Sequence, residues 1–382
     1  MIKVVFFPPG DKEWMGGVNY YKNLLFALST LENKVIEPIV FVGSSADKDV
    51  KKIYSQYSQV IEHPIFDRKS LYWFADKITG GCFLEGLLKK YQIDILSHIP
   101  VVKTAKWKTI SWIPDFQHVH LPDMFTQKEI NNRNSSFQKL AKYTDRVILS
   151  SYSALNDFKV FAPDYGYKAN VLQFVSQPER VVQLDSPISM EKKYGIQGDF
   201  FFIPNQFWKH KNHFLAFEAV NHLKNKGISV TLVCSGLMAD YRNTEYGTML
   251  LKYIESNKLE ENILLLGSIP YPDVFQLINE SIAVINPSLF EGWSSTVEEC
   301  KSVGREMILS DLGVHKEQYP GATFFIKDNY IDLATVMESF EPTIQEDANA
   351  ISLDLQERTK EFAAKYQAIV LNLYGRPKTE TI

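Results

Sequence analysis

The sequence predicts an α/β protein of two Rossmann-like domains, each a doubly wound parallel sheet, and three observations support this fold class. Short runs of β-branched and aromatic residues alternate with longer stretches in which apolar residues recur at helical spacing. The alternation occurs in two series, separated at 177–199 by a segment rich in proline, glycine and charge. The length of 382 residues is enough for two domains with separate cores.

The first series begins with an apolar run at 2–7, which Pro8-Pro9-Gly10 ends, and a helical pattern follows over 18–31. Further strands are expected at 35–42, 93–96, 109–113, 146–149 and 170–173, and helices at 71–91, 127–143 and 152–161. Parallel strands need crossover connections of this length between them. Residues 1–178 are therefore predicted to form the first domain.

The second series follows an expected linker at 179–198 and fills 199–363. Strands are expected at 200–203, 230–234, 263–265, 282–285, 307–309 and 323–326, and helices at 213–225, 244–257, 271–279 and 295–303. A further helix is expected over the tail at 345–374, where apolar residues can form one face. Ligands of such sheets bind at the carboxyl ends of the strands, so we expect the site in a cleft between the domains.

The composition argues against several classes of protein. A net charge of −4 is unlike that of a general nucleic-acid binder, which is usually basic. No apolar run approaches the roughly 20 residues that span a bilayer, and the first ten residues favour a strand over a secretory signal. Cys82, Cys234 and Cys300 lack metal-ligand spacing, so we expect buried thiols in a reducing cytoplasm and no bound metal.

The most informative residues lie at 286–300, NPSLFEGWSSTVEEC. An apolar run ends there in a loop, Gly292 permits a tight turn, and a helix follows. Ser294, Ser295 and Thr296 can each cap that helix, and Glu298 fits a capping box with Ser295. The N–H groups at such a helix end attract anions, phosphates above all.

Two carboxylates, Glu291 and Glu299, flank this predicted anion site. Acidic side chains would repel a phosphate, so we interpret them as acceptors for the neutral hydroxyls of a sugar or a ribose beside it. The alternative is that both glutamates only cap and solvate the helix. Short motifs of this kind carry a real risk of false matches.

A second candidate anion site is the loop within 201–213, FFIPNQFWKHKNH, which passes from a strand into a helix. Four basic side chains gather there: Lys209, His210, Lys211 and His213. A lysine at the mouth of a helix acts on a diphosphate as a point charge. The alternative is a solvated loop before a surface helix.

Two further loops follow predicted strands. The loop at 111–125 holds Asp115, His118 and His120, although each histidine could equally be an ordinary surface or half-buried residue. Gly16-Gly17 follows the first strand and would let the backbone approach a ligand closely, unless it forms only a turn.

The stretch at 286–300 resembles the E-x7-E motif of retaining glycosyltransferases of family 4, which have the GT-B fold and use nucleotide-sugar donors. Phe290-Glu291-Gly292, the Ser295-Thr296 pair and the small, apolar helix also fit the family's pattern. The resemblance implies that Glu291 holds hydroxyls of the donor sugar and that Glu299 holds the ribose. It also implies that the amides around Ser295 and Thr296 meet the diphosphate.

The basic loop resembles the family's glycine-arginine-…-lysine loop, with Lys211 at the position of the lysine. The position five residues earlier, usually an arginine, is Gln206 in this sequence. A glutamine can donate hydrogen bonds but cannot stabilise a leaving diphosphate by charge. Lys209 or His210 could take over that part.

The resemblance also assigns the remaining loops. Many members carry a His-Asp pair near the transferred sugar, and this sequence has Pro114-Asp115 there, with His118 shortly after. The family's glycine-rich loop, near the donor phosphates or the acceptor, corresponds to Gly16-Gly17. The loop that frames the nucleotide base corresponds to Ser268 and Ile269.

These residues together lead us to expect a retaining glycosyltransferase of GT-B fold. It would move a hexose-type sugar from a UDP-, GDP- or dTDP-linked donor to a glycan or lipid-linked glycan, in surface polysaccharide or lipopolysaccharide biosynthesis. The expected catalytic residues are Glu291, Lys211, His118 and Asp115, with no metal or other cofactor required. The family further implies that the last helix, about 364–382, packs back on the first domain.

Two alternatives stay open. A sugar-nucleotide-binding partner subunit without transfer activity would explain the departures at Pro114 and Gln206. A nucleotide-sugar epimerase of the same fold would be expected to carry acid and base carboxylates in its first domain.

A basic, aromatic segment in the first domain bears on the acceptor. It contains Lys103, Lys106, Trp107 and Lys108. Such a segment could rest on the anionic inner face of the cell membrane, beside a lipid-linked acceptor. A solvated connecting loop explains it equally well.

Overall fold

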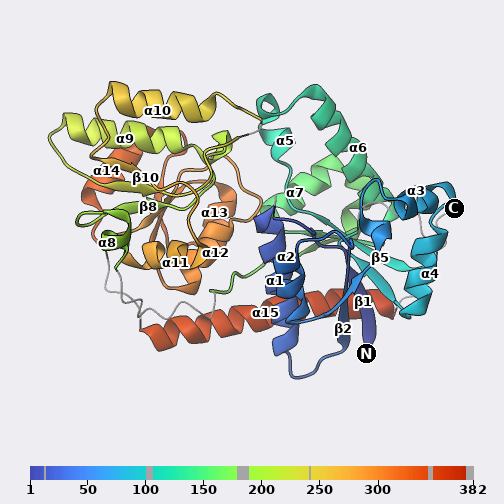
Figure 1. Ribbon diagram of the computed structural model, residues 1–382. Helices are drawn as coiled ribbons and strands as arrows, with labels where there is room; N and C mark the ends of the chain where they lie inside the picture. Colours follow the sequence, from blue (N-terminus) through green and yellow to red (C-terminus); the bar gives the residue numbers. More distant parts are fainter. Residues whose placement is uncertain (13, 100–105, 179–188, 241, 343–346, 376–382) are drawn as a thin grey trace. The chain divides into compact units, whose positions relative to one another are not determined.

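A computed structural model describes residues 1–12, 14–99, 106–178, 189–240, 242–342 and 347–375 (Figure 1). The chain divides into two compact units. Unit 1 comprises Met1–Phe116, Asn131–Ser176 and the chain from Gln356 on, and unit 2 comprises Gln117–Ile130 and Gln177–Leu355. Half of the expected linker, residues 179–188, and Lys103 of the basic segment lie outside the described residues.

Unit 1 contains a sheet of seven parallel strands among its described residues, in the order β3-β2-β1-β4-β5-β6-β7. The strands are β1 (Ile2–Phe6), β2 (Ile36–Val42), β3 (Gln59–Glu62), β4 (Ile95–Ser97), β5 (Lys108–Ile113), β6 (Arg146–Leu149) and β7 (Ala169–Val171). The order reverses between β1 and β4, as in a Rossmann domain.

Helices connect these strands. They are α1 (Met15–Thr30), α2 (Lys48–Ser55), α3 (Leu71–Ile78), α4 (Cys82–Lys90), α5 (Gln117–His120), α6 (Gln127–Tyr143) and α7 (Tyr152–Phe161). The single helix expected over 71–91 is wrong, because the chain turns between α3 and α4. Gly80 and Gly81 have φ values of +67° and +94°, in the left-handed region that favours glycine.

Unit 2 contains a six-stranded parallel sheet in the order β10-β9-β8-β11-β12-β13, again counted over the described residues. Its strands are β8 (Phe201–Ile203), β9 (Leu232–Cys234), β10 (Ile263–Leu265), β11 (Val284–Asn286), β12 (Met307–Ser310) and β13 (Thr323–Phe325). The two predicted parallel sheets are thus confirmed, and the second has its own reversal between β8 and β11.

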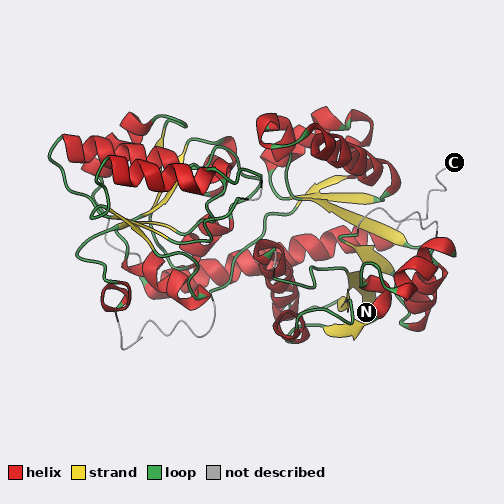
Figure 2. Ribbon diagram, turned by 45° about the horizontal axis from the view of Figure 1, so that its top comes forward, coloured by secondary structure: helices red, strands yellow, loops and turns green. Residues whose placement is uncertain are grey.

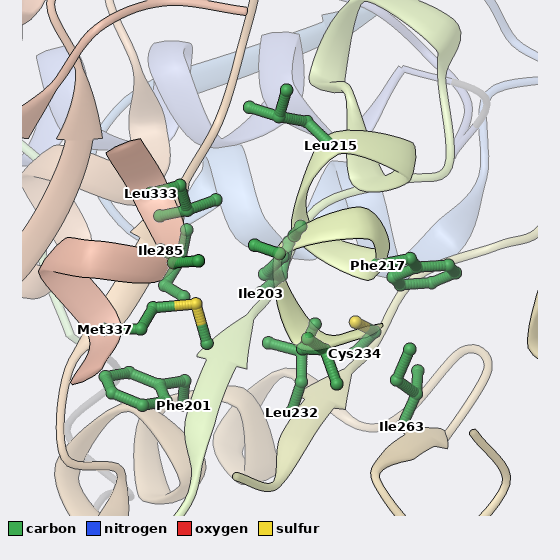
Figure 3. Close-up of a cluster of buried hydrophobic side chains, with 14 of the residues drawn as sticks. Phe201, Ile203, Leu215, Phe217, Leu232, Cys234, Ile263, Ile285, Leu333 and Met337 are labelled. Atoms are coloured by element: carbon green, nitrogen blue, oxygen red, sulfur yellow. The ribbon is translucent and has the colours of Figure 1, made fainter. Parts of the chain in front are cut away.

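The helices of unit 2 cover both faces of its sheet (Figure 2). They are α8 (Met190–Tyr194), α9 (His213–Asn225), α10 (Tyr246–Ser256), α11 (Tyr271–Glu280), α12 (Ser295–Ser302), α13 (Gly313–Gln318) and α14 (Tyr330–Ser339). Successive side chains of β8 point to opposite faces. Phe201 packs in the cluster with Leu333 and Met337 of α14 (Figure 3), whereas Phe202 packs with Val297 and Cys300 of α12.

The last helix, α15 (Ala348–Tyr374), begins in unit 2 and ends in unit 1. Within unit 1, the Tyr366 ring lies 5.8 Å from that of Phe6, and its hydroxyl donates to Ser97 Oγ at 2.7 Å. Lys108 Nζ donates to the carbonyl of Leu373 at 2.6 Å. Within the part of the chain that the structure describes, no helix is long and apolar enough to cross a membrane.

Candidate functional site

The centre of the candidate site lies where the strand order of unit 2 reverses. The loops after β8 and β11 leave neighbouring strands in this sheet, and such a reversal is where open α/β sheets bind ligands. Lys211 comes from the first loop and Glu291 from the second, and Lys211 Nζ lies 2.6 Å from Glu291 Oε1. Their side chains are only 14% and 9% exposed. The structure therefore brings together two of the four expected catalytic residues.

Glu291 is ionised despite its burial. Removal from water alone would raise the pKa of its carboxyl, but the charge and hydrogen bond of Lys211, together with His210 and His315, outweigh this and lower the pKa to about 2. Ser288 Oγ lies 2.7 Å from the same carboxylate oxygen. The carboxylate is therefore held in one orientation and stays negative at neutral pH.

A chain of hydrogen bonds fixes the loop that carries Glu291. Ser288 Oγ also lies 2.7 Å from Asn286 Oδ1, and Asn286 Nδ2 donates to Ser294 Oγ at 3.0 Å. Ser310 Oγ at the end of β12 donates to the carbonyl of Ser288 at 2.7 Å. These four side chains are buried. The loop is therefore preorganised by groups from two strands.

The first turn of α12 is held in a way that the sequence did not predict. The N-cap residue is Ser294, one of the three expected candidates, but its side chain makes no cap bond, and the capping box expected for Ser295 is wrong. Instead, the Gln318 amide accepts from Ser294 N at 3.0 Å and donates to Ser294 O at 2.8 Å. It also donates to Glu298 at 3.0 Å, and Lys301 Nζ lies 3.3 Å from that carboxylate. Gln318 thus supports the turn from α13.

Asn205 adds a polar group beside this turn. Thr296 Oγ1 donates to Asn205 Oδ1 at 2.9 Å, and both residues are buried. Asn205 Nδ2 is also buried and finds no hydrogen-bond partner among the described residues. A Cβ on Gly236, which has φ of +134°, would overlap the carbonyl of Asn205, so only glycine lets these loops approach.

Glu299 lies one helical turn further along α12 and is buried. The hydroxyl of Tyr271 donates to Glu299 Oε1 at 2.8 Å. Tyr271 is the first residue of α11, directly after the loop with Ser268, which is exposed, and Ile269, which is half-buried. This bond joins the loop expected at the nucleotide base to the residue expected at the ribose.

The other expected donor residues lie around this centre. Gly292 is half-buried in the bend before α12, and Ser295 is exposed at its first position. Gln206 and Lys209 are exposed; Gln206 Oε1 accepts from Leu237 N at 2.7 Å, and the Lys209 backbone N–H donates to Asp240 at 2.9 Å.

Arg242 is a cation that sequence reasoning did not single out. Its Nη2 lies 3.4 Å from His210 Nδ1, and Asp240 lies 3.4 Å from its Nε. Burial, followed by the charge of Lys211, lowers the pKa of His210 to about 3. His210 is therefore neutral at neutral pH and cannot replace the missing arginine. Arg242 places a permanent positive charge beside His210.

Part of the 111–125 loop belongs to unit 2. Gln117 Oε1 accepts from Arg242 Nη1 at 3.2 Å, and the exposed His120 ring stacks on Phe290 at 5.1 Å. His118 is buried, with its ring 6.4 Å from that of Phe125. Asp115 is half-buried and belongs to unit 1, so the structure assigns the two expected catalytic residues of this loop to different units.

Unit 1 has an aromatic group at its own strand reversal. Gly16 and Gly17 lie in the first turn of α1, and a Cβ on Gly17 would overlap the indole of Trp14. Trp14 stacks on Trp112 at 5.8 Å, and Trp112 stacks on Tyr20 at 4.1 Å. Gly17 therefore makes room for a stack of three rings, whose outer member, Trp14, is 44% exposed.

A neutral histidine lies beneath this stack. His98 follows β4, and its ring nitrogens lie 2.8 Å from Tyr20 Oη and 2.8 Å from Ser97 Oγ. Burial lowers the pKa of His98 to about 3. The backbone of His98 has φ of +56°, a conformation uncommon outside glycine and found most often at asparagine, aspartate and histidine. The network holds Tyr20 in place without placing charge at this end of the sheet.

The basic segment expected at a membrane is largely bonded within unit 1. Lys106 Nζ pairs with Glu85 at 2.7 Å, and Trp107 is half-buried and donates from Nε1 to the carbonyl of Ile93 at 2.9 Å. Of the three cysteines, Cys234 and Cys300 are buried as expected, but Cys82 is exposed. Among the described residues, no group of three or more His, Cys, Asp and Glu residues could hold a metal ion.

Comparisons with known proteins agree with this architecture. Residues 190–341 match the family model described as "Glycosyl transferases group 1". No curated protein matches the chain.

Several solved structures resemble the whole chain. Anabaena HepE, in complex with UDP and glucose, has a TM-score of 0.65 at 14% identity, over 98% of this chain and 100% of that one. A glycosyltransferase from Rickettsia africae has a TM-score of 0.63 at 16% identity, over 98% of this chain and 95% of that one. The lipopolysaccharide outer core galactosyltransferase WaaB has a TM-score of 0.63 at 16% identity, over 97% of this chain and 99% of that one. These likenesses show that the chain has the GT-B fold.

Proposed function

We propose that the protein is a retaining glycosyltransferase that moves a sugar from a nucleotide-diphosphate sugar to a glycan or lipid-linked glycan. The observation that carries the proposal is the buried pair of Lys211 and Glu291, which meets beside the N-terminus of α12. The match over 190–341 to a glycosyltransferase family supports it. The likeness to WaaB favours a role in lipopolysaccharide or surface polysaccharide biosynthesis.

The donor would bind to unit 2 with its diphosphate toward the first turn of α12. The amides at Ser295 and Thr296, the Lys211 ammonium and the buried Asn205 Nδ2 can each contribute a hydrogen bond to phosphate oxygens. Glu299 would accept hydrogen bonds from the ribose hydroxyls, and Glu291 from the sugar. HepE has been solved with UDP, so UDP-sugars are the first donors to test, before GDP- and dTDP-sugars.

The chemical step would occur at the anomeric carbon. The bond from this carbon to the diphosphate breaks, and a bond to an acceptor hydroxyl forms on the same face of the sugar. The acceptor proton passes to a diphosphate oxygen, which becomes more basic as the bond breaks. Lys211 and the α12 amides would stabilise the charge that grows on the leaving group, a task that needs no metal ion when cationic groups supply it.

Glu291 would then act by position. Its carboxylate is ionised and held by Lys211 and Ser288, so it can orient sugar hydroxyls without reorganisation during the reaction. No carboxylate nucleophile is assigned, because the proposed attack comes from the acceptor hydroxyl itself. We propose His118 as a further group near the transferred sugar, since it lies on the α5 segment of unit 2.

The acceptor would bind to unit 1. The exposed indole face of Trp14 is flat, and Trp112 and Tyr20 hold it from behind. The apolar C–H face of a pyranose ring fits such a surface, and a neutral sugar needs no charged partner there. This assignment uses the aromatic group that the sequence analysis did not recognise.

The substitution Glu291→Gln tests the function directly. Measurements on one preparation would be the melting temperature, calorimetric binding of free UDP, GDP and dTDP, and initial rates with radiolabelled sugars of all three. If Glu291 positions the sugar, nucleotide binding stays near that of the native protein and transfer falls by about two orders of magnitude or more. The melting temperature should also fall, because Lys211 loses its partner in a largely buried ion pair. A lowered melting temperature with normal transfer would reduce Glu291 to a structural residue.

Glu298→Gln provides a matched control, because Glu298 is also buried and lies 3.3 Å from a lysine in the same stretch. Glu298→Gln should lower the melting temperature and leave the rate of transfer near that of the native protein. The donor panel also separates the alternatives. Nucleotide binding without transfer or hydrolysis would indicate a partner subunit, a proposal that Gln206 favours, and an epimerised donor would indicate an epimerase.

A further inference from the structure

The α3 and α4 helices expose more apolar surface than an ordinary protein surface does. Five large apolar side chains of this pair are exposed: Leu71 (86%), Tyr72 (49%), Phe74 (48%), Ile78 (85%) and Phe83 (41%). A surface helix usually buries its apolar stripe against the core, yet α3 has no buried residue. We call these five side chains the α3–α4 face.

The turn between the helices keeps this face in one piece. Gly80 and Gly81 adopt left-handed conformations, and a Cβ at either would meet nothing within 4 Å, so the turn projects from the protein. Asp76 of α3 accepts from Leu84 N of α4 at 3.0 Å, which fastens the second helix to the first. Figure 1 shows α3 and α4 side by side at one edge of unit 1, and the two helices are in contact.

The charges around the face are arranged unequally. The acidic groups are bonded within the protein: Asp67 accepts from the Ser45 hydroxyl at 2.5 Å, Asp76 from Leu84, and Glu85 pairs with Lys106. By contrast, five basic residues of this region are exposed, namely Arg68, Lys69, Lys77, Lys89 and Lys90. Lys77 Nζ also lies 3.7 Å from the centre of the Trp73 ring. The surface that faces outward is therefore apolar with a basic margin.

Among the described residues of unit 1, no other helix exposes as many large apolar side chains as α3 does. Helix α7 exposes Tyr152 (58%) and Val160 (85%), and the unit 1 part of α15 exposes Leu371 (45%) and Tyr374 (50%). Helix α2 is also basic but buries Val50 and Tyr54 under its charged side. Clustered apolar exposure, unlike scattered exposure, indicates a binding surface.

We infer that the α3–α4 face binds the surface of an anionic lipid bilayer, lying in the interface without spanning it. Leucine, isoleucine and aromatic side chains would enter the boundary between headgroups and acyl chains, and the basic margin would meet anionic headgroups. Five exposed basic residues outnumber the three acidic residues of 67–90, none of which is exposed, so this face would meet an anionic surface with a net positive charge. This inference does not depend on the proposed transfer reaction, because it rests on residues outside the donor site.

Vesicle binding tests the inference with a matched pair of variants. The protein is sedimented with vesicles of phosphatidylcholine alone or mixed with phosphatidylglycerol. Native protein should bind the mixed vesicles, and more weakly at high salt. Leu71→Ser/Ile78→Ser should weaken this binding about tenfold or more, since both side chains are almost fully exposed. Val160→Ser/Tyr167→Ser removes similarly exposed side chains elsewhere in unit 1 and should bind as the native protein does.

The natural thiol of Cys82 gives a second readout. Cys82 is exposed at the start of α4, whereas Cys234 and Cys300 are buried, so an environment-sensitive fluorophore can be placed there without engineering. Its emission should shift to the blue with mixed vesicles but not with phosphatidylcholine alone.

Absence of binding to mixed vesicles, or equal binding of the Leu71→Ser/Ile78→Ser variant, would overturn the inference. A native dimer that this variant converts to a monomer, without vesicle binding, would assign the face to a second copy of the chain. Donor binding measured in solution is the separate test of the transferase. Loss of membrane binding with normal donor binding would therefore leave the proposed function standing.

Discussion

The two strand reversals of the molecule share one topology and carry opposite chemistry. In both sheets the third, second and first strands are followed by the fourth, fifth and sixth, so the loops after the first and fourth strands meet at one point. In unit 2 that point holds the buried ion pair of Lys211 and Glu291. In unit 1 it holds stacked rings over the neutral His98. The backbone thus provides the position, and the loop residues provide the function.

The difference corresponds to what each side would bind. A leaving diphosphate gains negative charge, and fixed positive groups in a buried site stabilise such charge strongly. A neutral acceptor sugar gains nothing from charge but can lose water against an aromatic face. If this comparison is right, substitutions in unit 2 affect the chemical step, and substitutions in unit 1 affect acceptor affinity.

The largest effect is expected for Lys211→Ala. Removing the charge should lower turnover by about a hundred- to a thousandfold, the usual cost of one group that stabilises a developing anion. Binding of the free nucleotide should weaken much less. The measurement is single-turnover transfer together with calorimetry. Full turnover in the variant would move the charge-stabilising role to Lys209 or Arg242.

The double variant Lys211→Ala/Glu291→Gln distinguishes catalysis from pairing. Lys211→Ala alone leaves Glu291 buried without its cation, which costs stability. Replacing the carboxylate as well should restore the melting temperature but not the rate. A double variant that regained activity would show that Lys211 serves mainly to neutralise Glu291.

The next effect is expected for Glu299→Ala. Loss of an acceptor for the ribose hydroxyls should weaken nucleotide binding by about 1–3 kcal/mol. Tyr271→Phe is the control, since it removes the 2.8 Å hydrogen bond to Glu299 while keeping the carboxylate and should change binding less. Calorimetry with the free nucleotide diphosphate is the measurement. Unchanged affinity in Glu299→Ala would exclude the ribose role.

Trp14→Ala carries the comparison to unit 1. Loss of the indole face should raise the acceptor KM about three- to tenfold, in line with the contribution of one stacked ring. Hydrolysis of the donor in the absence of acceptor should be unaffected. Trp14→Phe retains a flat ring, so its acceptor KM should lie between those of the native protein and Trp14→Ala. A fall in turnover at saturating acceptor, with KM unchanged, would break the proposed division of labour.

Much of the fold followed from hydrophobic periodicity. Helices α6, α7 and α9 and strands β6 and β10 have the predicted bounds, because each is a clearly patterned segment between turn residues. Strand β3 was missed, since its four residues pair at the edge of the sheet and none is buried. The break between α3 and α4 could have been predicted from Gly80-Gly81, which the helical pattern on either side obscured.

The site was predictable only in part. Lys211 and Glu291 stand in recognisable motifs, although 80 residues separate them. Arg242, Asn205 and Gln318 carry no motif, and they matter because folding brings them to the loops after β8 and β11. Trp14 was missed for a related reason. The glycines at 16 and 17 indicate a close approach of the backbone, and nothing in the sequence shows that Gly17 makes room for the Trp14 ring.

The smallest effect is expected on the stability of the protein in acid. His98 and Glu291 should change this stability in different ranges of pH. The folded-state pKa of His98 is about 3, whereas an unfolded histidine titrates near 6.5, so between these values the unfolded chain binds the extra proton. The stability contribution is therefore complete above pH 6.5 and declines as the pH falls. Between pH 7 and 5.5 it should cost about 1 kcal/mol. Glu291 changes the stability at lower pH than His98 does, because its depressed pKa makes stability depend on pH only below about pH 4.5.

His98→Asn tests this assignment, since asparagine tolerates the left-handed backbone and cannot take up the proton. Urea unfolding at pH 7 and 5.5 should show the variant losing about 1 kcal/mol less than the native protein over this interval. His120→Asn, at an exposed site, should follow the native protein. If His98→Asn kept the native acid sensitivity, the histidine would be protonated in the fold. The unit 1 reversal would then carry charge as the unit 2 reversal does, and the contrast between them would fail.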